Sequence, residues 1–112
     1  MHPQIVLITA PAMEEAERIA QTLVEERLAA CANLLPGITS IYRWEGRVER
    51  DFEMLLIVKT TDDCLPALIR RVRELHSYEV PEILAVPVTG GSPEYLAWLL
   101  SSVDSGAQMN KT

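Results

Sequence analysis

The sequence predicts an α+β fold with one sheet and helices packed on it. Apolar residues switch between β-rich runs and helical spacing in the order βαββαβ, followed by a C-terminal helix. Two βαβ halves joined by a hairpin are typical of the ferredoxin-like sandwich, with its helices on one face of the sheet. A chain of 112 residues with 48% apolar residues suits one globular domain. We expect this domain to span residues 1–103 and a loose C-terminal tail to span residues 104–112.

The first strand and the first helix are predicted within residues 4–28. Residues 4–10 (QIVLITA) form a continuous apolar run, as expected for a strand in the centre of a sheet. Pro11 suits the first turn of the next helix, because a backbone N–H is not needed there. Apolar residues then recur at helical spacing from Met13 to Leu28 with charged residues between them, so this segment predicts an amphipathic helix.

Two further β-rich segments predict a long central hairpin. The first covers residues 31–44 and is interrupted by Pro36-Gly37, which favours a bulge or an edge position. Residues 45–47 (EGR) are a turn candidate, and residues 52–60 form the second strand. This second strand is apolar on both faces of its 52–58 segment, although the helices cover only one face. A second subunit is the simplest cover for the other face.

The second half of the chain predicts a helix, a strand and a last helix. Residues 61–63 (TDD) supply N-cap candidates for a helix with an apolar face from Leu65 to Leu75. Residues 83–88 predict the fourth strand, and residues 92–94 (SPE) combine a cap, a proline and an acid at a helix start. The apolar face of this last helix consists of Leu96, Leu99, Leu100 and Val103.

Composition excludes several classes of function. A net charge of −6 argues against nucleic acid or an anionic membrane as the main partner. The apolar run Ile5–Ile8 is too short to span a bilayer, and no secretory signal is visible, so we expect a cytoplasmic protein. The sequence has no Walker, dinucleotide-binding, nucleophile-elbow, HExxH or CxxC motif. We therefore expect no enzymatic activity.

A few residues remain as candidates for chemistry. His76 falls on the core-facing side of the second helix, where it is either a hydrogen-bonded structural histidine or helix cap, or a metal ligand beside Tyr78, Glu79 or Glu82. Cys31 has small apolar neighbours, which predicts a buried, slowly reacting thiol, with a role in soft-metal binding or redox chemistry as the alternative.

Three aromatic residues and a second cysteine also have either a structural role or a role in binding or chemistry. Cys64 lies at a helix start, where the helix dipole lowers a thiol pKa, but no base or second thiol is near it in sequence. Tyr42, Trp44 and Trp98 either line a pocket or serve only in packing and subunit contacts.

Several blocks of sequence closely resemble the CutA divalent-cation tolerance proteins. They are residues 26–49 (ERLAACANLLPGITSIYRWEGRVE), 59–61 (KTT), 75–88 (LHSYEVPEILAVPV) and 95–99 (YLAWL). The resemblance implies a ferredoxin-like subunit in a tight cytoplasmic homotrimer, linked to tolerance of divalent metals and above all of copper. The family's architecture is also similar to that of the PII nitrogen-signalling proteins. The alternative function is therefore a trimeric signalling scaffold that binds a small ligand in clefts between subunits.

The resemblance also carries candidate sites, with departures from the family pattern. Some members have a cysteine in the first strand and two histidines at the end of the second helix as candidate copper ligands; the matching residues here are Ile8, Leu75 and His76. Because isoleucine and leucine cannot ligate, we expect only weak binding of copper or another divalent metal. We assign that site to His76, Cys31 and Glu82, and a ligand-binding cleft to Trp44, Tyr78, Glu79 and Lys59.

Overall fold

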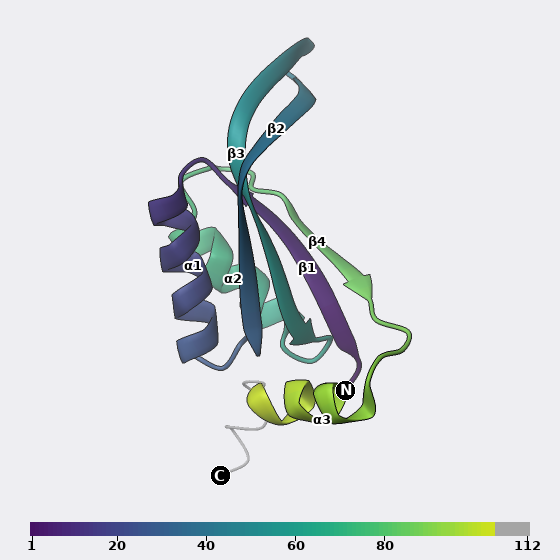
Figure 1. Ribbon diagram of the computed structural model, residues 1–112. Helices are drawn as coiled ribbons and strands as arrows, with labels where there is room; N and C mark the ends of the chain where they lie inside the picture. The colour runs from purple at the N-terminus through teal and green to yellow at the C-terminus, as the bar shows by residue number, and fades with distance from the viewer. Residues whose placement is uncertain (105–112) are drawn as a thin grey trace.

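The structure is a computed structural model that describes residues 1–104. It contains three helices and a four-stranded antiparallel sheet of order β2-β3-β1-β4 (Figure 1). The elements are β1 (Pro3–Ala10), α1 (Met13–Glu25), β2 (Cys31–Trp44), β3 (Arg47–Thr61), α2 (Leu65–Leu75), β4 (Ile83–Pro87) and α3 (Pro93–Ser102). The α+β class and the predicted order of the elements are confirmed. The predicted tail at residues 104–112 lies outside the described residues, apart from Asp104.

The core lies between the sheet and the pair α1 and α2, which cover one face of the sheet (Figure 1). The strand β1 pairs with β3 on one side and β4 on the other, so its predicted central position is confirmed. Because β3 lies between β1 and β2, the first βαβ unit is split by a strand of the second half. The fully buried side chains on this inner face include Val6, Ile8, Leu56 and Val58 from the strands and Ile19, Leu23, Leu68 and Val72 from the helices.

The hairpin of β2 and β3 continues beyond the rest of the sheet. The register between these strands shifts between Leu35 and Ile38, so Pro36-Gly37 forms the predicted bulge on an edge strand. The last pair between β1 and β3 is Ala10 with Met54, and past it β2 is the only strand within residues 1–104 that pairs with β3. We call residues 38–53 the arm; Figure 1 shows it projecting from one end of the sheet.

The arm closes in a tight turn and has two different faces. Glu45 and Gly46 have φ values of 50° and 78°, the left-handed pair that a two-residue hairpin turn requires. Directly paired residues share a face. One face carries Phe52, Ile41 and Val48, which are 73%, 66% and 65% exposed, together with Arg43 and Arg50. The opposite face carries Tyr42, Trp44, Glu49, Asp51 and Glu53 together with Arg47.

The outer face of the sheet is apolar and largely bare. Leu35, Leu84 and Val86 are 51%, 59% and 48% exposed on it. The helix α3 lies across one end of the sheet, where Leu99 and Val103 pack with Ala30 and Cys64 (Figure 1). The sequence argument that a large apolar surface lacks a helical cover is therefore confirmed for the described residues.

Three local predictions at the helix ends are wrong. Pro11 precedes α1, and Ala12 is its N-cap. The helix then stops at Glu25 because the chain turns through Arg27 at a φ of 61°, which leaves Leu28 packed on the core from outside the helix.

The start of α2 also differs from the prediction. The N-cap is Cys64, which makes no capping side-chain bond, and Thr61 still belongs to β3. The Asp62 carboxylate instead accepts the backbone N–H of His2 at 2.8 Å, which lowers the pKa of Asp62 to about 2.

The strand β3 begins at Arg47, five residues before the predicted start, because the arm keeps polar residues in regular pairing.

Neighbouring residues of α1 provide a matched test of the core. Leu23 is fully buried, whereas Val24 is 40% exposed. Leu23→Ala should lower the free energy of unfolding by about 2–5 kcal/mol, because a cavity remains in the core. Val24→Ala should change it by less than about 0.5 kcal/mol. Urea denaturation at one fixed protein concentration measures both, and equal effects would contradict this assignment of the core.

Candidate functional site: a pocket at the base of the arm

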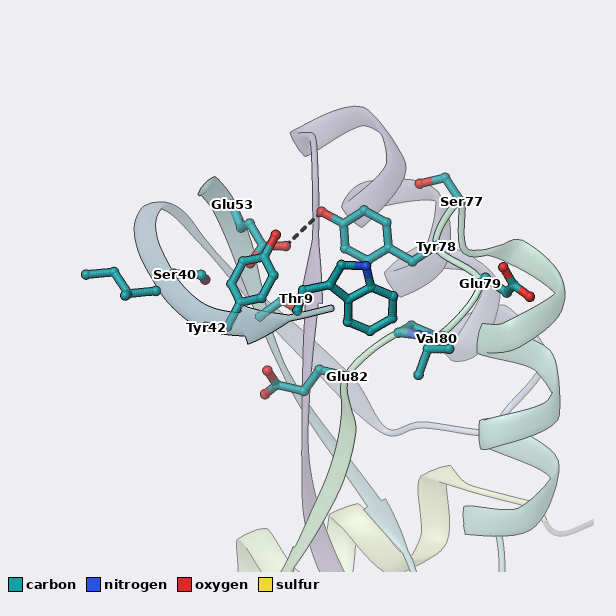
Figure 2. Close-up of a pocket in the computed structure, with 12 residues that line it drawn as sticks. Thr9, Ser40, Tyr42, Glu53, Ser77, Tyr78, Glu79, Val80 and Glu82 are labelled. Carbon is teal, nitrogen blue, oxygen red and sulfur yellow. Dashed lines mark hydrogen bonds between the residues drawn. The ribbon is translucent and has the colours of Figure 1, made fainter. Parts of the chain in front are cut away.

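A pocket of about 800 Å³ lies between the arm and the segment that joins α2 to β4. Three parts of the chain line this pocket. They are Thr9 of β1, Ser40, Ile41, Tyr42, Trp44 and Glu53 of the arm, and Ser77, Tyr78, Glu79, Val80, Pro81 and Glu82 of the joining segment. Figure 2 shows the two sets of side chains converging, with Tyr42 and Glu53 on one side and Tyr78 and Val80 on the other. Its walls combine aromatic rings and carboxylates, and no Lys, Arg or His is among the described residues that line it.

The joining segment, residues 77–82, is held in place by its first residues. The helix α2 ends at Leu75, and His76 adopts an extended conformation with φ −81° and ψ 141°. Pro81 disfavours helical geometry at Val80, and the chain bends through residues 77–80 before β4 begins at Ile83. This conformation turns the side chain of Tyr78 toward the arm (Figure 2).

The buried ring of His76 is fully used in structural hydrogen bonds. Its Nε2 lies 2.7 Å from the carbonyl oxygen of Thr9, which can only accept, so Nε2 carries the proton. Its Nδ1 lies 3.0 Å from the backbone nitrogen of Tyr78, which can only donate, so Nδ1 accepts. The Nε2 bond ties the end of α2 to β1, and the Nδ1 bond fixes the start of the segment that follows α2. The structural interpretation of His76 fits these contacts, although its predicted partners Glu79 and Glu82 are not among them.

Glu15 of α1 anchors the same segment from the other side. Its Oε2 accepts the backbone N–H of Ser77 at 2.9 Å and the Ser77 hydroxyl at 3.0 Å. Burial acts to raise the pKa of Glu15, but the two hydrogen bonds from Ser77 and the nearby charges outweigh it, and the pKa of this carboxyl is lowered. The same oxygen lies 3.3 Å from Nδ1 of His76. A glutamate on α1 therefore fixes the first residue of the pocket's joining segment.

A buried carboxylate on the arm completes the pocket. Glu53 is 5% exposed, and its Oε2 accepts the hydroxyl of Tyr78 at 2.9 Å (Figure 2). Burial and this carboxylate raise the pKa of Tyr78, so its hydroxyl remains a donor at neutral pH. The bond joins the arm to the segment after α2. Sequence reasoning did not single out Glu53, although a lone acid within the apolar run 52–58 is the signal that could have found it.

A second tyrosine on the arm is also hydrogen-bonded to an acid. The hydroxyl of Tyr42 donates to the carboxylate of Asp51 on the paired strand. This bond raises the pKa of Tyr42 to about 12, so the ring stays neutral and its position on the arm is fixed. Both tyrosines thus present neutral rings in an acidic surrounding.

The structure brings together four of the predicted site residues. Trp44, Tyr78, Glu79 and Glu82 all line the pocket, although Glu82 was assigned to the metal site and the other three to the cleft. Lys59 does not line it, because its ammonium group donates to Asn33 on the outer face of the sheet.

The predicted metal ligands do not form one site within a chain. Through its partner Lys59, Cys31 lies level with Ile5 of β1. His76 contacts Thr9, which is four residues further along the same strand. That offset corresponds to about 13 Å along the strand, far beyond a shared coordination sphere. Within residues 1–104 no group of three His, Cys, Asp or Glu side chains could hold a metal ion. The residues present therefore do not fit a three-ligand copper site in a single subunit.

The two cysteines lie in different environments. Cys31 is half-buried and its Sγ lies 3.6 Å from the hydroxyl of Tyr95, so the prediction of a buried Cys31 is wrong. Its small neighbours Ala30 and Ala32 face the other side of the sheet, because side chains alternate along a strand. Cys64 is the fully buried thiol, and both cysteines are free.

Comparison with known proteins identifies the family. A family model described as "CutA1 divalent ion tolerance protein" matches residues 4–102. The chain belongs to this CutA1 family. Within residues 1–104 no helix is both long enough and apolar enough to cross a membrane.

Several CutA1 relatives match nearly the whole chain. The divalent-cation tolerance protein CutA of Thermus thermophilus is 58% identical over 96 residues, which are 86% of this chain and 93% of that protein. The chloroplastic protein CutA of Arabidopsis thaliana is 48% identical over 98 residues; the match covers 88% of this chain and 54% of that longer protein.

Solved structures of CutA proteins have the same fold as this chain. The structure of the divalent cation tolerance protein from Thermus thermophilus has a TM-score of 0.90 at 55% identity and covers 91% of this chain and 99% of that one. The protein titled "Periplasmic divalent cation tolerance protein CutA" from Archaeoglobus fulgidus has a TM-score of 0.88 at 42% identity, with 91% and 99% of the two chains covered.

The two histidines allow a matched test of the structural role of His76. His76→Ala should lower the free energy of unfolding by about 2–4 kcal/mol, because it leaves a cavity and an unpaired Thr9 carbonyl. His2→Ala should have no measurable effect, because this exposed residue uses only its backbone N–H and C=O, which the substitution keeps. Thermal and urea unfolding measure the difference, and a His76→Ala protein as stable as wild type would contradict the role described here.

Glu15 predicts a specific pH dependence. Because its pKa is lower in the folded protein than its ordinary value of 4.5, ionised Glu15 stabilises the fold at neutral pH. That contribution should disappear as the pH falls through 4.5 toward the folded-state pKa. Glu15→Gln should thus be less stable than wild type at pH 7, and the two proteins should converge once the pH has fallen below the folded-state pKa of Glu15. Glu14→Gln on the exposed side of α1 is the control, and parallel curves for Glu15→Gln and wild type would contradict the assignment.

Proposed function

We propose that this protein is a non-enzymatic, cytoplasmic homotrimer that acts in divalent-cation tolerance by binding cations weakly through pocket carboxylates. One observation carries the cation-binding part: Glu53 and Glu82 line a pocket to which residues 1–104 contribute no basic side chain, and two carboxylates without a third ligand hold a cation only weakly. Carboxylate oxygens bind divalent cations, and copper would be preferred to zinc on the general affinity order. The family name, divalent ion tolerance protein, points to the same ligands.

The trimer is supported by surfaces that a single chain leaves bare. Phe52, Ile41 and Val48 place a large apolar area on one face of the arm. The outer face of the sheet adds Leu35, Leu84 and Val86, and both edge strands keep free backbone groups. Contiguous exposed apolar surface of this kind usually marks a protein interface. Two apolar patches on different parts of the molecule suit head-to-tail contacts, which close into a ring.

The non-enzymatic role and the cytoplasmic location are each supported by side chains of the protein. A non-enzymatic role is supported by the pocket, because the Ser77 hydroxyl donates to the carboxylate of Glu15 and both nitrogens of the adjacent His76 are bonded to backbone groups, so no serine is paired with an imidazole among the described residues. A cytoplasmic location is supported by the two free thiols. Relatives carry names that place them in chloroplasts and in the periplasm, so fractionation of cells that express the tagged chain is the direct test.

A second candidate function is a PII-like trimeric signalling scaffold. The pocket of about 800 Å³ favours it, because this volume is typical of small-molecule sites rather than of a site for one metal ion. In this function the arm would report occupancy of the pocket to the neighbouring subunits.

Sedimentation velocity tests the assembly. Wild type should sediment as a trimer at micromolar concentration, and Phe52→Glu should shift it to a monomer because each contact would bury an unpaired charge. Val24→Asp places a charge on the exposed part of α1 and should leave the trimer intact. A stable, folded wild-type monomer would refute the proposed assembly.

Calorimetric titration tests the cation site. Cu²⁺ and Zn²⁺ should bind to wild type with dissociation constants in the micromolar range or weaker, on the order expected for carboxylates without a thiolate or several imidazoles. His76→Ala should leave this affinity nearly unchanged, because the ring is occupied by backbone groups. Nanomolar copper binding that disappears in His76→Ala would contradict the proposal.

A further inference from the structure

Glu53 is a largely buried residue whose oxygen Oε1 stays accessible, and it has no cationic partner among residues 1–104. Glu53 is 5% exposed, and it takes part in none of the ion pairs within residues 1–104. One oxygen, Oε2, accepts the hydroxyl of Tyr78, and Oε1 accepts no hydrogen bond from the described residues. Buried charges in proteins are normally paired or bound to a cation. The free oxygen belongs to a residue that lines the pocket, so a positive group within the pocket could reach it.

The walls around Glu53 suit an organic cation. Tyr42, Trp44 and Tyr78 line the same pocket, and aromatic rings attract ammonium and guanidinium groups through their electron-rich faces. The hydroxyls of Tyr42 and Tyr78 are both directed to acids, so the rings are held in fixed positions beside negative charge. An aromatic cage with a buried counter-ion is the arrangement by which proteins recognise substituted ammonium groups.

The pocket offers a second anionic group at a distance from Glu53. In Figure 2 the carboxylate of Glu82 points toward the arm, whereas that of Glu79 points away from it. The volume of about 800 Å³ exceeds the need of a single metal ion and lies within the range of small-molecule sites. Two separated carboxylates favour a ligand that is positive at both ends.

We propose that this pocket binds a small, linear organic cation with ammonium or guanidinium ends. Glu53 is the counter-ion of one end, Tyr42, Trp44 and Tyr78 surround it, and Glu82 attracts the other end. This inference rests on the second candidate function, the signalling scaffold, because it names the class of small ligand that the scaffold's pocket would bind. It also gives a role to the acids and aromatic rings that gather on the face of the arm with Glu53, because these side chains would face the ligand.

Titration calorimetry with agmatine, a four-carbon chain with one ammonium and one guanidinium end, tests the proposal on the intact wild-type protein. Agmatine should bind once per chain, more weakly as salt increases, and succinate of similar length should not bind. Glu53→Gln keeps an acceptor for Tyr78 but removes the charge, and should weaken binding about tenfold or more. Trp44→Leu should weaken binding independently of that charge. Glu17→Gln, which removes an exposed charge from α1, should leave the affinity unchanged.

The outcomes separate this inference from the proposed function. Absence of agmatine binding at millimolar concentration, or equal binding by wild type and Glu53→Gln, would overturn the inference. If agmatine fails while Cu²⁺ binds in a Glu53-dependent manner, the pocket is a metal site and the proposed cation tolerance still stands. If an arginine of a second copy fills the pocket, agmatine binds only to the monomeric Phe52→Glu protein, which also refutes the inference. Agmatine binding to a wild-type monomer would support the inference and refute the trimer.

Discussion

The length of β3 is the constraint on which the other features of this molecule depend. The strand runs from Arg47 to Thr61, but β1 can pair with it only as far as Met54. In its second half β3 is a core strand with buried Leu56 and Val58, whereas its first half has β2 as its only neighbour. A two-stranded ribbon is marginal by itself in water. The arm therefore needs further contacts, which its own chain supplies at its base and which the proposed trimer would supply along its exposed face.

The contacts at the base of the arm are polar, which explains why a pocket forms there. Tyr78 reaches Glu53 by one hydrogen bond, and the backbone around Tyr78 is positioned by His76 and Glu15. A chain of hydrogen bonds thus runs from α1 through the joining segment to the arm. Because these bonds hold the two walls without filling the space between them with apolar side chains, a cavity with acidic and aromatic walls remains. The same bonds use both nitrogens of His76 but only one oxygen of Glu53, which leaves that carboxylate able to accept a further donor.

Much of this architecture could be predicted from residue patterns, and the failures have local physical causes. The central position of β1, the bulge at Pro36-Gly37 and the bare apolar face follow from hydrophobic periodicity and from what proline and glycine permit. The end of α1 could not be predicted, because Leu28 continues the helical spacing although Arg27 takes a left-handed conformation. The bond between Glu53 and Tyr78 joins residues 25 apart in sequence, and no local pattern encodes such a pairing. Cys31 was grouped with His76 although its strand register places it at the far end of the sheet.

The central claim is that a second copy of the chain holds the arm in place, and hydrogen exchange of the intact protein tests it most directly. Exchange should be slow for the amides of residues 47–53 in wild type at micromolar concentration. In Phe52→Glu these amides should exchange rapidly while those of β1 and α1 remain protected, because the core does not depend on the arm. Rapid exchange of residues 47–53 in wild type, or unchanged protection in the variant, would contradict the account.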